Sequence, residues 1–124
     1  MIPRYRAWDK EFKEMVQVDA LIFDEQIIKA TYKNGNIVKE DLKNYVLMQS
    51  TGLKDKNGKE IFEGDIIDST DGFLTGVIEF RVSLGMFVSD LVEYNNFERL
   101  CNVASSRKII GNTWEHPKLA EVSS

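Results

Sequence analysis

Acidic side chains near the centre of the chain are the first candidates for chemistry. Glu63 and Asp65 flank Gly64, and Asp68 and Asp71 follow closely. Paired carboxylates can perform acid–base catalysis or bind a hard cation such as Mg²⁺ or Ca²⁺. Beside a glycine, however, an aspartate more often accepts hydrogen bonds from the backbone amides of a tight turn. We therefore expect Asp65 to stabilise a turn at Gly64, and we expect no metal site and no catalytic site.

A cysteine–histidine pair is the second candidate, because Cys101 and His116 are the only residues of their types. Nucleophilic catalysis needs the base within hydrogen-bond reach of the thiol. Cys101 falls on the apolar positions of a predicted short helix, where a cysteine behaves as a small hydrophobic side chain. One cysteine and one histidine also leave two zinc ligands to be found among carboxylates. We predict a protein that is not an enzyme and that has no cofactor.

Two glycines at the centre resemble a phosphate-binding loop without matching its spacing. That loop requires two glycines five positions apart, followed by Lys and then Ser or Thr. Gly52 and Gly58 are six positions apart, and Glu60 follows Lys59. A calcium loop counted from Asp55 fails as well, because Lys59 stands where the third ligand belongs. We therefore predict no nucleotide site and no calcium site of these kinds.

Lysines and aromatic residues are the remaining candidates, and they point to binding. Three lysines surround one predicted hairpin turn and can form a local basic spot, although exposed lysines usually serve solubility. Aromatic side chains line the grooves with which small barrels bind peptides. Phe97 lies three residues after Tyr94 and can contribute to such a groove. The candidate binding residues are Trp8, Lys54, Lys56, Lys59, Tyr94 and Trp114.

The distribution of charge limits the class of partner. The net charge is −4, but residues 1–60 carry 11 basic against 10 acidic side chains and residues 61–124 carry 5 against 10. Proteins that bind nucleic acids usually present a basic face to the phosphates. The acidic second half therefore disfavours nucleic acid and favours a protein as the partner.

The length and composition indicate one cytoplasmic domain, residues 1–124. No apolar run approaches the ~20 residues that span a bilayer. The first residues, Met1 to Arg6, lack the hydrophobic stretch of a signal peptide. A single cysteine cannot form an internal disulfide, so nothing points to an oxidising compartment. We expect no membrane partner.

Glycine turns divide the chain into short segments that read as strands. Asn34-Gly35 predicts a hairpin between residues 27–33 and residues 37–38, because both turn residues tolerate positive φ. Asn57-Gly58 and Asp71-Gly72 predict two further turns. Short strands at ~8–12-residue spacing, separated by such turns, are typical of a small barrel or sandwich. The fold is therefore predicted to be mainly β.

One segment breaks the β pattern. Apolar side chains at positions i, i+3, i+4 and i+7 predict a short helix from Asn96 to Ala104. Pro117 can open a final helical turn. Within residues 75–82, alternating apolar side chains indicate a strand. The helical positions are Phe97, Leu100, Cys101 and Ala104, and the alternating positions are Ile78, Phe80 and Val82.

Short motifs occur in a characteristic order along the chain. They are Arg6-Ala7-Trp8-Asp9, Leu47-Met48-Gln49, residues 51–61, Glu63-Gly64-Asp65-Ile66, Ile109-Ile110-Gly111-Asn112 and His116-Pro117-Lys118-Leu119. In this order they resemble the YopX family, small proteins encoded by phages and prophages of Gram-positive bacteria. The resemblance covers both ends and the centre, about half of the residues. Ser50, Trp114 and His116 depart from the residues common in the family.

The resemblance implies a mainly β protein in which residues 45–124 form an SH3-type barrel or roll. Residues 1–44 would form an N-terminal region of strands and hairpins, which either packs on the barrel or exchanges between subunits, and one or two short helices are expected. We expect a phage or prophage accessory protein, a non-catalytic binding module that acts on a host or phage protein. Pairing of open strand edges would make it a homo-oligomer. The alternative is a small β-barrel that binds nucleic acid.

Overall fold

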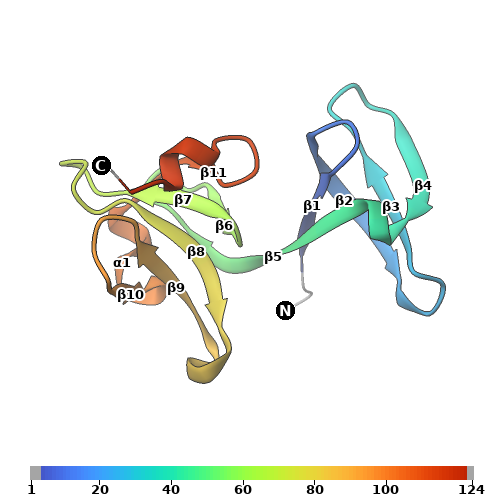
Figure 1. Ribbon diagram of the computed structural model, residues 1–124. Helices are drawn as coiled ribbons and strands as arrows, with labels where there is room; N and C mark the ends of the chain where they lie inside the picture. The colour runs from blue at the N-terminus through green and yellow to red at the C-terminus, as the bar shows by residue number, and fades with distance from the viewer. Residues whose placement is uncertain (1–3, 123–124) are drawn as a thin grey trace. The chain divides into compact units, whose positions relative to one another are not determined.

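The protein is built mainly from antiparallel β-strands, as the sequence predicts. The computed structural model describes residues 4–122, and strands joined by turns and short helices make up most of them. The chain divides into two compact units, residues 1–49 and residues 50–124 (Figure 1). Each unit contains its own cluster of buried hydrophobic side chains.

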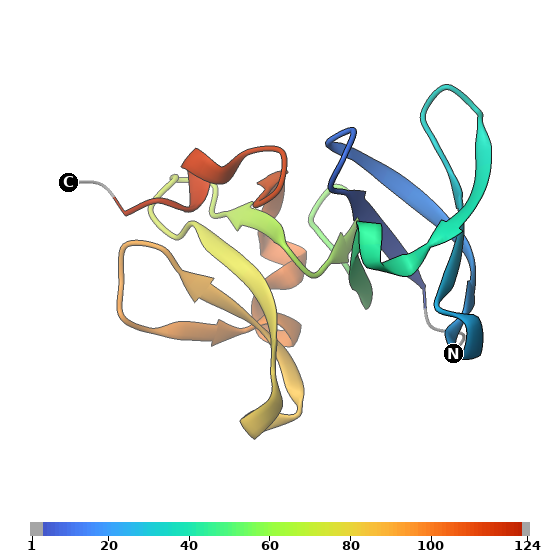
Figure 2. The ribbon, with the colours of Figure 1, turned by 45° about the vertical axis from the view of Figure 1, so that its right-hand side comes forward.

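The first unit is a meander of four strands followed by a strand that returns to the first. In space the order is β4-β3-β2-β1-β5 (Figure 2). The strand β5 then continues into the second unit, where Ser50 and Lys54 pair with β6. The elements are β1 (Tyr5–Asp9), β2 (Glu14–Ile22), η1 (Phe23–Glu25), β3 (Ile27–Thr31), β4 (Ile37–Asp41), η2 (Leu42–Asn44), β5 (Tyr45–Lys54) and β6 (Glu60–Phe62).

The turns predicted from glycine are confirmed. Gly35, Gly58 and Gly72 have φ angles of 90°, 80° and 79°, which favour glycine. In the first of these turns the Gly35 amide donates to the carbonyl of Tyr32 (2.9 Å), and the Tyr32 amide donates to the carbonyl of Asn36 (2.8 Å). These two bonds close the hairpin between β3 and β4.

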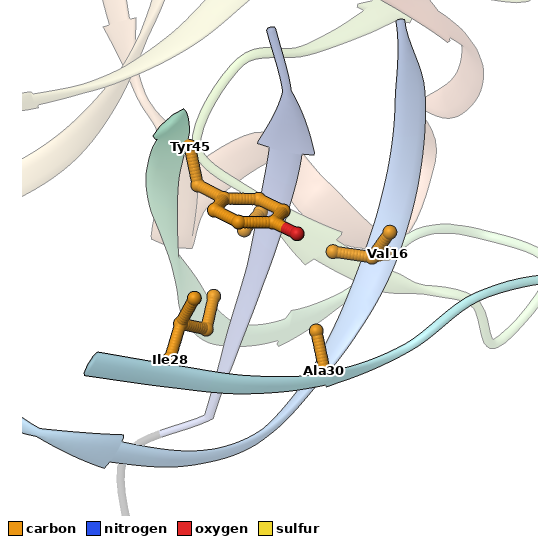
Figure 3. Close-up of a cluster of buried hydrophobic side chains, with 5 residues drawn as sticks. Val16, Ile28, Ala30 and Tyr45 are labelled. Atoms are coloured by element: carbon orange, nitrogen blue, oxygen red, sulfur yellow. The ribbon is translucent and has the colours of Figure 1, made fainter. Parts of the chain in front are cut away.

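Alternate residues of the first sheet bury one face. Val16, Ile28, Ala30 and Tyr45 gather from β2, β3 and β5 (Figure 3), and Ala7 of β1 completes the cluster. Because side chains alternate between the faces of a strand, one residue in two reaches this core.

A buried carboxylate fixes the turn between β1 and β2. Asp9 accepts hydrogen bonds from the amides of Glu11 (2.9 Å) and Phe12 (3.2 Å), and the Tyr32 hydroxyl donates to its second oxygen (2.5 Å). The Tyr32 and Tyr45 hydroxyl oxygens are 2.6 Å apart. Burial and the bond to Asp9 raise the pKa of Tyr32, so its phenol keeps the proton that it donates.

The second unit has an antiparallel sheet of five strands in the order β10-β9-β8-β7-β11. Both sheets have free edges, so the described residues form no closed barrel. The SH3-type arrangement of residues 45–124 stays a prediction. The elements are β7 (Asp65–Asp68), β8 (Gly76–Arg81), η3 (Val82–Leu84), β9 (Met86–Leu91), β10 (Phe97–Arg99), α1 (Leu100–Val103), η4 (Ala104–Ser106), β11 (Lys108–Asn112) and η5 (Pro117–Ala120).

The helix predicted from Asn96 to Ala104 is wrong in its first half and in the burial of Cys101. Phe97 begins strand β10, and the α-helix starts only at Leu100. Leu100 and Ala104, one turn apart, are buried with Ile61, Ile67 and Ile78, whereas Cys101 points to solvent. Pairing with β9 offers residues 97–99 a full ladder of backbone hydrogen bonds, which outweighs a weak helical periodicity. The final turn predicted at Pro117 is confirmed as η5.

A buried carboxylate also holds the second unit together. One oxygen of Asp55 accepts hydrogen bonds from the amides of Asn57 and Lys59, both at 2.9 Å, and so closes the Asn57-Gly58 hairpin. The other oxygen accepts from the amide of Ile109 (3.0 Å) in β11, 54 residues away in sequence. Burial alone would raise the pKa of Asp55, but these three amide donors lower it below its ordinary value of 3.8.

We predict that Asp55→Asn destabilises the second unit by about 2 kcal/mol. One of the three backbone amides that donate to Asp55 would then face the NH₂ group of the new asparagine. Faster amide hydrogen exchange at Ile109 and Lys59, together with urea unfolding, measures this effect. The lowered pKa means that the carboxylate stabilises fully above pH 3.8 and loses its effect as the pH falls further. Glu121→Gln, an exposed acid in the same unit, is the control, and equal effects of the two variants would contradict the prediction.

The buried Ser89 leads to a second prediction about stability. Its side chain is fully buried against Gly76, and its hydroxyl is one of the buried groups without a hydrogen-bond partner within residues 4–122. An unsatisfied buried hydroxyl costs about 1–3 kcal/mol. Ser89→Ala should therefore raise the free energy of unfolding by about 1 kcal/mol in urea unfolding. The exposed Ser83→Ala should change nothing, and a loss of stability in Ser89→Ala would show that the hydroxyl is satisfied in solution.

Candidate binding site

The central acidic residues form a turn, as predicted. The Phe62 amide donates to a side-chain oxygen of Asp65 (2.8 Å), and Asp65 is buried. Gly64 has a φ of 84°, and its amide donates to the carbonyl of Ile78 (2.9 Å), which ties the turn to β8. Within residues 4–122, no group of three or more His, Cys, Asp or Glu side chains could hold a metal ion.

His116 also has a structural contact. Its Nδ1 accepts a hydrogen bond from the amide of Asn112 (3.2 Å), directly beside Gly111. A Cβ at Gly111 would lie 2.6 Å from the same Nδ1, so the absence of a side chain allows this close approach. Cys101 lies in α1, and its thiol donates weakly to the side chain of Asn102 (3.6 Å).

The three candidate lysines lie on one exposed hairpin. Lys54, Lys56 and Lys59 surround the Asn57-Gly58 turn, and all three are exposed. Lys56 also lines a pocket of about 270 Å³ together with Lys108 of β11. The same pocket contains two acids, Asp68 and Asp71, which offset the lysine charges, and the hydroxyls of Ser69 and Thr70.

The three candidate aromatic residues are not brought together. Trp8 lies within β1 and is only 8% exposed. Trp114 follows β11 and is 41% exposed, while Tyr94 lies between β9 and β10 and is 52% exposed. Tyr94 lines a pocket in which the second aromatic residue is Phe97.

That pocket, with a volume of about 400 Å³, is the candidate binding site. Its lining residues come from β8, β9 and β10 and from the loop between β9 and β10. Asp90 is directly opposite Val77 of β8 on one side and Phe97 of β10 on the other, so these side chains share one face of the sheet. The pocket is lined by Arg81, Asp90, Leu91, Tyr94, Asn95, Asn96 and Phe97.

Arg81 lines the pocket and is held there by its neighbours. Its guanidinium group forms ion pairs with Asp90 (2.8 Å) and with Glu79 (3.1 Å). The same group lies over the ring of Phe97, with its central carbon 4.2 Å from the ring centre. A cation in this position is attracted by the negative face of the ring as well as by the carboxylates. The pocket therefore already contains one bound cation, supplied by the chain itself.

Two carboxylates compete for this single cation: Asp90 lines the pocket, and Glu79 lies beside it on β8. Burial, the hydrogen bond with Glu79 and repulsion from its charge raise the pKa of Asp90 to about 6, although Arg81 opposes the shift. The pKa of Glu79 is lowered, first by the hydrogen bond from the Asp90 carboxyl and then by Arg81. The two acids thus share a proton and titrate as a pair.

Glu79, Arg81 and Asp90 were not among the binding residues predicted from the sequence. A signal was present, because Ile78 and Phe80 alternate along β8, and the intervening Glu79 and Arg81 must then lie on the opposite face. Val82 is a different case: it lies beyond β8 in η3 and is 84% exposed, so the predicted apolar row ends early. Asp90 carried no sequence signal, because its partners come from another strand.

Comparison with known proteins gives a consistent result. The family model described as YopX protein matches residues 4–121. The crystal structure of protein EF1440 from Enterococcus faecalis is similar, with 31% sequence identity and a TM-score of 0.69 over 98% of this chain and 99% of that one. Protein yopX from Bacillus subtilis shares the fold, with 23% identity and a TM-score of 0.58 over 94% of this chain and 96% of that one. No curated protein matches the chain.

One further finding concerns membranes. In the part of the chain that the structure describes, no helix has the length and apolar character needed to cross a bilayer.

We predict that Asp90 titrates with a pKa of about 6, which the carboxyl carbon shift in an NMR titration measures directly. Glu79→Gln should lower this pKa, because the variant removes the neighbouring negative charge. Arg81→Gln should raise it further, because the variant removes the compensating cation. An Asp90 pKa that does not change in Glu79→Gln would contradict the proposed coupling.

Proposed function

The chain belongs to the YopX family, and from that premise we propose that it is a non-catalytic binding module whose partner is a host or phage protein. The pocket around Tyr94 and Phe97 is the observation that carries this proposal. Exposed tyrosines beside a polar pocket suit protein recognition, since they contribute apolar contact area and a hydroxyl at low entropic cost.

The charge of residues 61–124 supports a protein rather than a nucleic acid as the partner. Residues 61–124 carry 10 acidic and 5 basic side chains, and this segment provides every residue that lines the pocket. An SH3-type arrangement of residues 45–124 belongs to the same proposal, because such domains bind extended peptides in grooves lined by aromatic side chains.

Association between copies is part of the proposal. The strand β4 is a free edge of its sheet, and Ile37 at its start is exposed. A free edge can pair with the edge of another copy, although Lys39 in the middle of β4 is the kind of residue that opposes such pairing. A monomer mass in light scattering would remove this part of the proposal.

Nucleic-acid binding through the lysine hairpin is the second candidate. In its favour, Lys54, Lys56 and Lys59 are exposed and Lys108 lies near Lys56. Against it, Asp68 and Asp71 line the same pocket as Lys56. The stacking residue proposed for this function, Trp8, is buried in β1.

We predict that Tyr94→Ala reduces capture of protein partners from host lysate at least several-fold, because the variant removes the exposed wall of the pocket while leaving the core intact. The measurement is quantitative mass spectrometry of proteins retained by the immobilised full chain. Phe73→Ala is the matched control, since Phe73 is an aromatic residue of the same unit that is 70% exposed and lies outside the pocket.

Equal capture by Tyr94→Ala and the unchanged chain would contradict a role for the pocket. A shift of single- or double-stranded nucleic acid at low salt, abolished by Lys54→Glu, Lys56→Glu and Lys59→Glu together, would favour the second candidate. Such binding would weaken steeply as the salt concentration rises.

A further inference from the structure

We propose that the pocket between β8, β9 and β10 binds a cationic side chain, an arginine or a lysine, presented by a basic segment of the partner. This inference rests on the proposed function and names the chemistry that the pocket recognises.

The position of Arg81 shows that this surface binds a cation. An aromatic ring below the guanidinium group and carboxylates at its edge are the two features with which proteins bind cations. Here Phe97 provides the ring, and Asp90 and Glu79 provide the carboxylates. Tyr94 lines the same pocket and offers a second, half-exposed ring. The arrangement can hold a second cation beside Arg81.

The charge count of the pocket favours a cation over an anion. When both acids are ionised, Glu79 and Asp90 carry two negative charges against the single positive charge of Arg81. The remaining charge is −1, and a shared proton neutralises it at low pH. A cation from a partner can take the place of that proton. An anionic ligand would have to bind Arg81 while displacing two carboxylates, which costs both ion pairs.

One further cation stands on this face of the sheet: Arg99 of β10 is opposite Val88, two residues along β9 from Asp90, and it is exposed. On β8, the charged groups that face Asp90 are Glu79 and Arg81. On β10, the residue opposite Asp90 is the uncharged Phe97. The next residue, Glu98, is already bound by Arg107, with contacts of 2.6 Å and 3.2 Å. The asparagines of the pocket, Asn95 and Asn96, are neutral and can donate or accept hydrogen bonds at its rim.

Binding should therefore depend on pH in a defined direction. A cationic side chain binds the ionised pair, and protonation of Asp90 competes with it. Because the pKa of Asp90 is about 6, the affinity should fall about tenfold between pH 7.5 and pH 5. Arginine keeps its charge over this range, so the change belongs to the protein.

The test is an NMR titration of the full, ¹⁵N-labelled chain with the peptide Gly-Ser-Arg-Ser-Gly. Its matched controls are the same peptide with citrulline, and one with glutamate, in place of arginine. The expected result is a saturable shift of the amide signals of Asp90 and residues 94–97 with the arginine peptide. The citrulline peptide should bind at least about tenfold more weakly, because it lacks the charge.

Two variants of the pocket and one outside it complete the design. Glu79→Gln and Asp90→Asn should each weaken arginine binding about tenfold, and Asp90→Asn should also remove the dependence on pH. His116→Gln should leave the pH dependence unchanged, since the only histidine lies at η5, outside the pocket. The amide spectrum of each variant reports whether it is folded.

Equal binding of the arginine and citrulline peptides, or tighter binding of the glutamate peptide, would overturn the inference. So would an absence of any shift at millimolar peptide. If none of these peptides binds but Tyr94→Ala still abolishes capture of a protein, the proposed function holds and only the cationic specificity fails. If the arginine peptide binds and protein capture does not depend on Tyr94, the inference holds and the proposed function fails.

Discussion

The register of β8, β9 and β10 is the constraint on which the pocket depends. Pairing of Ile78 with Ser89 sends both side chains inward, to the buried face of the second unit. Glu79, Arg81 and Asp90 must then lie on the other face, because successive side chains of a strand alternate between faces. Val88 lies on that face too and is buried. A shift of one residue in this register would bury Arg81 and Asp90 and expose the core, so packing itself specifies where the charged side chains lie.

Buried aspartates stabilise turns elsewhere in the chain. Asp9, Asp55 and Asp65 are each almost fully buried, and each accepts hydrogen bonds from backbone amides of its own turn. Asp55 does more, because its second oxygen binds the amide of Ile109 and joins the hairpin to β11. A charged acceptor strengthens these bonds, and the low pKa of Asp55 shows that the ionised form is the one that the fold requires.

Local chemistry explains what could be predicted from the sequence. The turns at Gly35, Gly58 and Gly72 were predictable because positive φ is a property of single residues. The role of Asp65 followed from the adjacent Gly64. The helix was wrong at Phe97 because pairing with β9 depends on a strand that a local pattern does not contain. The pocket was missed for the same reason: Arg81, Asp90 and Phe97 come from three strands, and only the sheet brings them together.

The acidic residues of the second unit therefore differ in what compensates their charge. The carboxylate of Asp55 is compensated by three backbone amides, which are fixed by the fold and cannot be exchanged for a ligand. The carboxyl of Asp90 is compensated by a shared guanidinium group at a surface pocket and, below its pKa of about 6, by a proton, which exchanges freely with solvent. A raised pKa of one acid and a lowered pKa of the other follow from this difference. A ligand can bind at a carboxylate only where it can replace the group that balances the negative charge. Asp90 is therefore suited to recognition and Asp55 to stability.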